Sequence, residues 1–193
     1  MPRFDVHPAT PERWPDVVTV MGTRGDPSRC FCQYFHLRGK DWSGGRTDEF
    51  RDRLCAQVAA DVAPGVLAYD GGAPVGWCQV GPKETFARLA SSKASAPPPD
   101  DPDLDDLWAI TCLVVPAKQR RRGVAHALVE GAVAHATTHG ATTVEAYPVD
   151  TGAKATVSSA ELYHGTLAMF LAAGFTELRR PLPTRAVVRL TTG

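Results

Sequence analysis

The fold is decided by residues 107–140, which read LWAITCLVVPAKQRRRGVAHALVEGAVAHATTHG. Residues 107–115 form a nearly continuous apolar run with β-branched side chains, which is typical of a central strand buried on both faces. Residues 123–139 predict a helix that ends at Gly140, because glycine readily adopts the left-handed conformation that closes a helix. A further strand is predicted over residues 142–147, so the order strand, helix, strand indicates a βαβ unit with two parallel strands.

The connection between this strand and this helix predicts an anion-binding site. It contains Gln119-Arg120-Arg121-Arg122-Gly123-Val124-Ala125. The first turn of a helix presents free backbone N–H groups and the positive end of the helix dipole, which together bind phosphates. Glycine allows close approach of the backbone, and the arginines can donate charge-assisted hydrogen bonds. The alternative is a solvated helix start, since such charge runs are common on protein surfaces.

The remaining segments predict a mixed α/β sheet flanked by helices. Further strands are expected over residues 3–7, 65–69, 75–80, 175–179 and 186–190. Helices are expected over residues 11–21, 47–60 and 159–173, with a short helix over 83–91. Residues 22–45 are predicted to be irregular, and residues 92–106 and 148–158 are predicted loops. These segments predict one domain over residues 1–193.

The composition is that of a globular protein, with 44% hydrophobic and 22% charged residues and a formal net charge of zero. This balance argues against a dedicated nucleic-acid-binding protein, which usually carries a basic excess. No apolar run reaches the roughly 18 residues that span a bilayer, and the first residues lack a signal core. We therefore expect no membrane and no nucleic-acid partner, and a cytoplasmic location. The five cysteines are irregularly spaced and do not indicate a disulfide framework.

The pattern Arg-x-x-Gly-x-Ala at residues 120–125, with Leu113-Val114-Val115 before it, resembles motif A of the GNAT superfamily of N-acetyltransferases. Val75-Gly76, residues 143–146 and residues 168–175 resemble the neighbouring family motifs in the same order, so the resemblance covers nearly the whole chain. The segment 30–35, together with residues 75–78, resembles a subset of bacterial members.

The resemblance implies a mostly antiparallel mixed sheet with one splayed parallel strand pair, flanked by helices. It also implies that acetyl-coenzyme A is the acetyl donor and that a primary amine attacks the thioester directly. The coenzyme-binding residues implied by it are Leu113, Val114, Val115, Arg120, Arg121, Arg122, Gly123, Val124 and Ala125. Backbone groups of the strand would bind the pantetheine amides, and N–H groups near the helix start would bind the pyrophosphate.

Catalytic groups are less evident, because the two positions that often carry them in the family hold Phe170 and Ala109. Tyr163 is the candidate acid, since it lies seven residues before Phe170 on the same face of the predicted helix. The alternative for Tyr163 is packing in the core or contact with pantetheine. Glu145 is the candidate base, directly or through water, with a structural ion pair as the alternative. His164 is a further candidate base, although a lone helical histidine is more often structural.

The cysteine-rich segment permits two other interpretations. Cys30, Cys32 and His36 fall short of the four ligands of a structural zinc site, so no metal is predicted. Lining of the acceptor pocket or core packing is the favoured role for these residues. Cys112 in the central strand could form an acetyl-cysteine, but buried cysteine behaves mostly as a small apolar residue.

The acceptor should be recognised by the first third of the chain and by the predicted loops. Aromatic residues that could wall a pocket are Tyr34, Phe35, Trp42 and Trp77, and acidic residues that could attract an amine are Asp101, Asp103, Asp105 and Asp106. The alternative for the aspartates is solvation of a loop. We expect a small-molecule amine and a monomer or homodimer. The alternatives are a protein or peptide amine, and a catalytically inactive module that binds acyl-coenzyme A.

Overall fold

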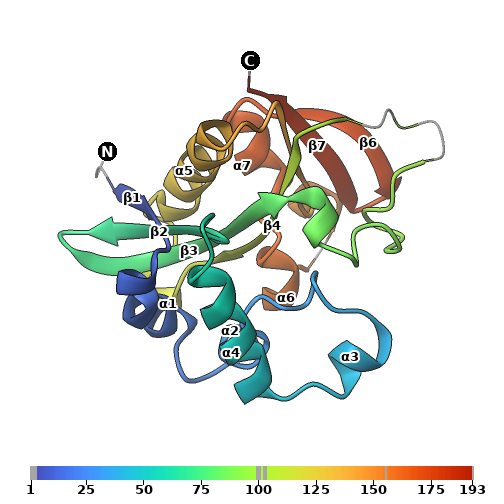
Figure 1. Cartoon of the computed structure of the whole chain (residues 1–193). Coiled ribbons are helices and arrows are strands. Elements are labelled where there is room, and N and C mark those ends of the chain that lie inside the picture. The colour runs from blue at the N-terminus through green and yellow to red at the C-terminus, as the bar shows by residue number, and fades with distance from the viewer. Residues whose placement is uncertain (1–3, 99–100, 102–103, 155, 193) are drawn as a thin grey trace.

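The structure is a computed structural model that describes residues 4–98, 101, 104–154 and 156–192. Its centre is one seven-stranded sheet of order β1-β2-β3-β4-β5-β7-β6 (Figure 1). The strands are β1 Asp5–Pro8, β2 Gly65–Asp70, β3 Ala73–Pro82, β4 Leu107–Val114, β5 Thr143–Ala146, β6 Thr176–Leu182 and β7 Arg185–Thr191. Every neighbouring pair is antiparallel except β4 and β5, which are parallel. The predicted mixed sheet is therefore confirmed.

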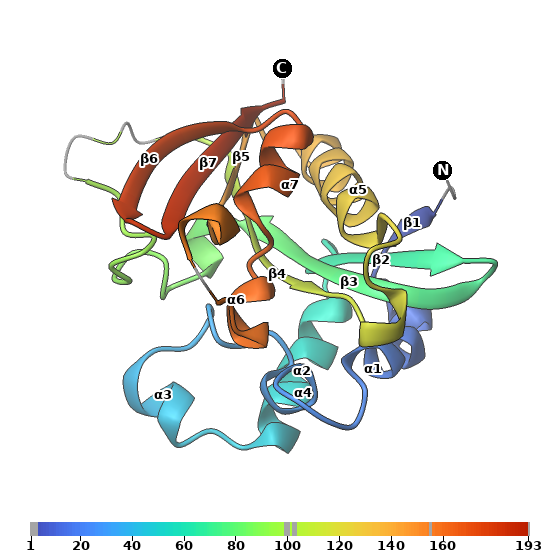
Figure 2. The same ribbon diagram turned by 180° about the vertical axis from the view of Figure 1, so that it is seen from behind.

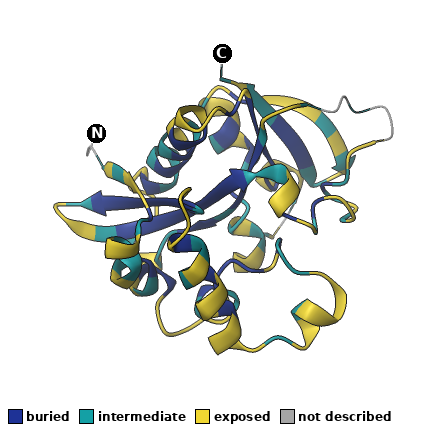
Figure 3. Cartoon of the chain, viewed as in Figure 1, coloured by how far each residue is buried: buried dark blue, intermediate teal, exposed yellow. Residues whose placement is uncertain are grey.

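Helices cover both faces of this sheet (Figures 1 and 2). They are α1 Trp14–Met21, α2 Pro27–Cys30, α3 Gly39–Ser43, α4 Thr47–Val58, α5 Val124–Thr138, α6 Ser159–Leu162 and α7 Leu167–Ala172. One buried core joins α5 and α7 to the sheet, and a second joins α1 and α4 to its other face. Strands β2 to β5 are mostly buried, whereas α3 and much of β6 are exposed (Figure 3). Among the described residues, no helix is long and apolar enough to cross a membrane.

The parallel strands β4 and β5 separate halfway along β4. They pair only from Leu107 with Thr143 to Ile110 with Ala146, where β5 ends. On the other side of β4, Gln79 pairs with Cys112 whereas Val80 pairs with Ile110, so β4 carries an extra residue at this point. Such a bulge bends a strand and increases its twist. The second half of β4 is thus free of β5, which confirms the predicted splayed pair.

The connection between α6 and α7 lies against β4 where β5 has left it. The backbone N–H of Leu113 donates to the carbonyl of Tyr163 at 2.7 Å. The predicted continuous helix over residues 159–173 is wrong, because Gly165 has φ +72° and interrupts it. A separate N-cap, the hydroxyl of Thr166, then starts α7 by accepting from the N–H of Met169. Tyr163 therefore caps α6 and does not share a helical face with Phe170.

Two further predictions differ from the structure. The short helix predicted over residues 83–91 is limited to one 3-10 turn, η2 Lys83–Thr85. The segment predicted to be irregular over residues 22–45 contains the short helices α2 and α3. Three more 3-10 turns, η1 Pro11–Arg13, η3 Ala117–Gln119 and η4 Thr151–Ala153, lie in connections. None of these differences alters the sheet, because they concern short segments without a strong apolar periodicity.

Candidate active site

Two cavities lie beside the unpaired half of β4. The large cavity has a volume of about 650 Å³ and is lined by residues from α2 to α4, β4, α6 and β7. The small cavity has a volume of about 300 Å³ and lies between the end of β4, the start of α5, and the α6–α7 connection. Tyr163 lines both cavities. A ligand in either cavity can therefore contact this tyrosine.

The small cavity contains most of the residues that the sequence assigned to coenzyme binding. Seven of the predicted residues line it: Leu113, Val115, Arg120, Arg121, Gly123, Val124 and Ala125. Val114 and Arg122 do not. The side chain of Val114 packs in the core on the other face of the sheet, because neighbouring residues of a strand point to opposite faces.

The backbone at the start of α5 is shaped for an anion. Gly123 is the N-cap residue with φ +91°, and Arg121 also has a positive φ of 61°. The carbonyl of Gly123 accepts the first helical hydrogen bond, from the N–H of Ala127. The N–H groups of residues 124–126 therefore have no partner within the helix. These groups and the helix dipole attract negative charge.

The three arginines beside Gly123 have different roles. The guanidinium of Arg122 pairs with Asp70 at 2.6 Å and bonds Gln119, so it ties the loop to the β2–β3 hairpin. Arg120 lines the small cavity, and its Nε donates to the carbonyl of Val115 at 3.1 Å. Arg121 lines the cavity as well, and its side chain bonds no other residue within the described part of the chain. Arg120 and Arg121 are thus the cations available to an anion here.

The backbone of β4 is partly engaged within the chain. The N–H of Leu113 is bonded to Tyr163, and the carbonyl of Val115 is bonded to Arg120. The pantetheine contacts implied for these two residues would need these bonds to open or would use other backbone atoms. The lining of the cavity and these two bonds thus bear differently on the predicted coenzyme-binding residues.

Tyr163 is the residue best placed for proton transfer between the cavities. It is half-buried, and it follows the last residue of α6. Burial raises the pKa of Tyr163 above its usual 10, and the nearby carboxylate of Asp26 raises it further. The phenol is therefore protonated at neutral pH and can donate a proton.

An aromatic wall bounds the large cavity. The ring of Trp42 stacks on Phe50 at 5.1 Å, and Tyr34 meets Trp42 edge-on at 5.2 Å. Arg88 fixes this segment, because its guanidinium lies 4.1 Å from the Tyr34 ring and its Nε donates to the Tyr34 carbonyl at 2.6 Å. The structure brings together the predicted Tyr34, Phe35 and Trp42, whereas Trp77 is fully buried in the core and lines neither cavity.

His164 faces the large cavity next to Tyr163. Its Nδ1 lies 3.4 Å from the carbonyl of Thr111, at the bulge of β4, and its ring meets Phe35 edge-on. Burial, followed by the positive charge of Arg185, lowers the pKa of His164 to about 4. The imidazole is therefore neutral at pH 7. If Nδ1 carries the proton toward Thr111, Nε2 is an acceptor.

A buried hydrogen-bond chain supports the bulge behind His164. The hydroxyl of Thr111 donates to the amide oxygen of Gln79 at 2.9 Å, and the Gln79 amide nitrogen lies 3.1 Å from Nε2 of His36. Nδ1 of His36 is 2.8 Å from the carbonyl of Thr85. His36 is thus used in this chain and does not line the large cavity with Cys30 and Cys32.

Cys30, Cys32 and Cys112 line the large cavity as free thiols. Burial raises the pKa of the Cys30 thiol to about 12. A hydrogen bond with Cys112, followed by burial, raises the pKa of Cys32 well above its usual value. Cys30 and Cys32 are therefore small apolar wall residues at neutral pH. Within residues 4–192, excluding the undescribed positions, no group of three or more His, Cys, Asp or Glu side chains could hold a metal ion.

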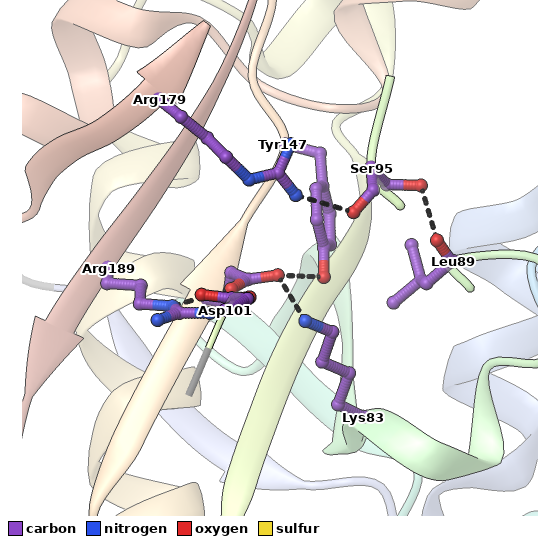
Figure 4. Close-up of polar contacts among 8 residues, drawn as sticks. Lys83, Leu89, Ser95, Asp101, Tyr147, Arg179 and Arg189 are labelled. Atoms are coloured by element: carbon purple, nitrogen blue, oxygen red, sulfur yellow. Dashed lines mark hydrogen bonds and ion pairs between the residues drawn. The ribbon is translucent and has the colours of Figure 1, made fainter. Parts of the chain in front are cut away.

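Glu145, the predicted base, lies away from both cavities. Its carboxylate is fully buried and pairs with Lys83 at 2.8 Å and with Arg189 at 2.6 Å (Figure 4). The hydroxyl of Tyr147 donates to it at 2.5 Å, and Arg189 also pairs with Asp101 at 2.7 Å. A carboxylate held by three partners in the interior has no access to an acceptor. This geometry favours the alternative of a structural ion pair over the predicted base role.

The other acidic residues predicted to attract an amine also lie elsewhere. Asp101 belongs to the ion network just described, and Asp105 and Asp106 do not line the large cavity. Asp103 lies outside the described residues. The acidic residues that do line this cavity are Asp26 and Glu161, and the basic ones are Arg29 and Arg185. Sequence reasoning missed all four, because no local pattern distinguishes them from surface charges.

Ala109 and Phe170 occupy the two positions that often carry proton-transferring side chains in the family that the sequence resembles, and both are inaccessible. Ala109 is fully buried in the sheet, and Phe170 is fully buried against Phe175 with ring centroids 5.1 Å apart. Neither side chain can exchange a proton.

Comparison with known proteins agrees with this arrangement. A protein-family model described as the acetyltransferase (GNAT) family matches residues 31–164. A search of curated proteins finds no match to the chain.

Among solved structures, the chain is similar to an N-acetyltransferase from Staphylococcus aureus Mu50, with TM-score 0.55, 11% identity and 98% of each chain covered. It is also similar to the PaiA N-acetyltransferase from Thermoplasma acidophilum in complex with coenzyme A, with TM-score 0.54, 8% identity, and 98% of this chain and 99% of that chain covered. The GNAT domain of S. lividans PAT gives TM-score 0.54 and 18% identity, with 97% of this chain and 90% of that chain covered. At these identities the structural likeness shows the fold.

Proposed function

Since the chain belongs to the acetyltransferase (GNAT) family, we propose that it transfers the acetyl group of acetyl-coenzyme A to a primary amine of a small molecule. The observation that carries the proposal is the position of Tyr163, which lines both the small and the large cavity. One cavity then holds the donor and the other holds the acceptor. Their contact at a protonated phenol is the place for acetyl transfer.

The small cavity fits the donor. A coenzyme A molecule carries a pyrophosphate and a long, largely apolar arm. The N–H groups at the start of α5, with Arg120 and Arg121, suit the pyrophosphate. Leu113, Val115 and Met169 supply an apolar lining for the arm.

The large cavity fits a small acceptor. Its volume of about 650 Å³ lies within the range of small-molecule sites, about 300 to 1,000 Å³. Its aromatic wall provides flat apolar surfaces, and Asp26 attracts a cationic amine. These features favour a compact amine over a protein or peptide segment.

Acetyl transfer requires that the amine lose its protons and that the sulfur gain one. The amine nitrogen forms a bond with the acetyl carbon as the carbon–sulfur bond breaks. Tyr163 gives its phenolic proton to the departing sulfur and recovers a proton from solvent. His164 is a weak base because of its low pKa, so it accepts a proton from the nitrogen only after attack has made that nitrogen acidic. The first proton of the ammonium leaves to water before attack.

A release assay tests this function. The protein is incubated with acetyl-coenzyme A and a panel of primary amines, free thiol is followed with a chromogenic reagent, and the product is identified by mass spectrometry. We expect thiol release that depends on the amine and matches the amount of N-acetylated product. An inactive acyl-coenzyme A-binding module is the alternative, favoured by the buried Ala109 and Phe170. Tight coenzyme binding without thiol release from any amine would establish that alternative.

A further inference from the structure

Arg185, the first residue of β7, places a positive charge in the wall of the large cavity. It is half-buried, and within the described part of the chain its guanidinium forms no hydrogen bond or ion pair. The burial lowers the pKa of Arg185. A half-buried charge without a partner loses part of its hydration, which costs free energy unless another group compensates it.

The other arginines of the β6–β7 hairpin, unlike Arg185, each have a partner within the described chain. Arg189 pairs with Glu145 and Asp101, and Arg180 pairs with Glu177 and Asp150. Arg179 donates to the carbonyl of Ser95 at 2.8 Å. Arg185 is the arginine of this hairpin that points into a cavity, so the partner that it lacks within the described chain can come from a ligand.

The carboxylate of Glu161 acts on Arg185 at longer range and raises its pKa slightly against the effect of burial, but the two side chains form no ion pair. Glu161 lines the large cavity, but its carboxylate pairs with Lys154 at 2.5 Å and accepts from the N–H and the hydroxyl of Ser158. These bonds lower the pKa of Glu161 to about 2, so its charge is balanced by Lys154. His164, the adjacent side chain, is neutral. The wall around Arg185 is therefore positive overall.

Asp26 and Arg29, from the start of α2 and from within it, add one negative and one positive charge to the wall. Asp26 lines the same cavity as Tyr163 and its charge raises the pKa of that phenol, so a cationic amine held by Asp26 would lie in the cavity that Tyr163 also lines. The aromatic wall of Tyr34, Trp42 and Phe50 belongs to the same cavity. A ligand that fits all three features has an amine, an apolar body and an anionic group.

We propose that the acceptor is an amino acid or another amine that carries a carboxylate, and that Arg185 binds this carboxylate. This inference rests on the proposed function and adds the class of acceptor to it. The planar guanidinium offers two parallel N–H donors that match the two oxygens of a carboxylate. Arg185 is then a residue that determines specificity, while Tyr163 remains the residue that transfers the proton.

The test compares amines that differ only in the carboxylate. The first pair is L-phenylalanine and phenethylamine, and the second is 4-(aminomethyl)benzoate and benzylamine. The amine and the carboxylate are close together in L-phenylalanine and far apart in 4-(aminomethyl)benzoate. Binding to the protein saturated with coenzyme A is measured by calorimetry, and turnover is measured by thiol release. The variants are Arg185→Met and Arg185→Lys, with Arg185→Gln as a second neutral replacement if the first folds poorly. Arg24→Met is the matched control, because Arg24 is exposed and lines neither cavity.

We expect the wild-type protein to bind the carboxylate member of at least one pair more tightly by roughly tenfold or more. Arg185→Met should remove this preference, Arg185→Lys should restore part of it, and Arg24→Met should leave it intact. Equal affinity for the two members of both pairs would overturn the inference. So would an equal loss for both members in Arg185→Met, or no binding of either carboxylate at millimolar concentration.

These failures differ from a failure of the proposed function. If acetyl transfer proceeds with the amines that lack a carboxylate, the acetyltransferase function stands and only the role of Arg185 is wrong. If coenzyme A does not bind, or no amine of either kind releases thiol, the proposed function itself is contradicted. The calorimetric comparison of each pair decides the role of Arg185 independently of turnover.

Discussion

The small and the large cavity are built in different ways. The anion-binding end of the small cavity depends on the backbone of one continuous segment, where Gly123 has a positive φ and α5 begins. The large cavity depends on side chains from residues 26–50, from the bulge of β4, from α6 and its C-terminal end, and from β7. The difference shows why one site has a local sequence signature and the other has none. A backbone site needs glycine and a helix start at adjacent positions, whereas a side-chain site only needs the final fold to bring its residues together.

The strongest test of this difference is Gly123→Val. A β-branched side chain at φ +91° is strained, and it would also cover the N–H groups at the start of α5. We expect coenzyme A binding to fall by at least roughly a thousandfold, equivalent to about 4 kcal/mol. Calorimetry with coenzyme A measures this loss, and binding of acceptor amines should be unaffected.

The matched control is Gly140→Val at the other end of the same helix. Gly140 has φ +88° and no neighbouring atom within 4 Å of an added Cβ, so both variants carry a similar backbone strain. That strain should lower the free energy of unfolding by roughly 1 to 3 kcal/mol in each. Unchanged coenzyme affinity in Gly123→Val, or an equal loss of affinity in Gly140→Val, would show that the start of α5 does not bind the donor.

The next largest effect should come from the residue that lines both cavities. Tyr163→Phe removes the phenolic proton but keeps the ring, so coenzyme affinity should change little. Turnover should fall by about a hundredfold to a thousandfold, the usual size of a lost general acid. Thiol release at saturating acetyl-coenzyme A measures it, with Tyr69→Phe as control because the Tyr69 hydroxyl bonds Asp16 away from both cavities. Equal turnover in the two variants would remove Tyr163 from the mechanism.

The sequence could predict the sheet and the start of α5 because their signals are local. The apolar run that becomes β4 and the glycine at residue 123 each lie within a few positions of what they determine. The break at Gly165 was missed, although a glycine inside a helical pattern indicates a possible interruption. This break changes the site, because it turns the Tyr163 carbonyl to Leu113. The role of Arg122 was equally hidden, since its partner Asp70 lies 52 residues away.

A substitution of Glu145 probes a third region, the part of the sheet where β4 and β5 are paired. Glu145→Gln removes the negative charge between Lys83 and Arg189, and leaves Lys83 without its partner and Arg189 with Asp101 alone. Breaking a buried pair in this way costs about 3 kcal/mol of unfolding free energy. Turnover per folded molecule should be retained, because Glu145 lines neither cavity.

Urea unfolding and thiol release on the same preparation give both quantities for Glu145→Gln. Glu177→Gln is the matched control, since Glu177 pairs with Arg180 on the exposed strand β6 and such surface pairs contribute at most about 1 kcal/mol. A large loss of turnover in Glu145→Gln with little loss of stability would restore the base role that the sequence suggested.

The smallest effect concerns the wall of the large cavity, where His164 couples stability to pH. Burial and Arg185 lower its pKa from 6.5 to about 4, so between these values the unfolded chain binds a proton that the native chain does not. The contribution of neutral His164 to the free energy of unfolding is thus fully present above pH 6.5 and is lost as the pH falls toward 4. Between pH 7 and pH 5 the wild type should lose about 2 kcal/mol more unfolding free energy than His164→Gln. Urea unfolding at both pH values measures this, and the exposed His7→Gln should follow the wild type. An identical pH dependence in wild type and His164→Gln would mean that His164 is solvated in the native protein and is not held in the wall of the large cavity.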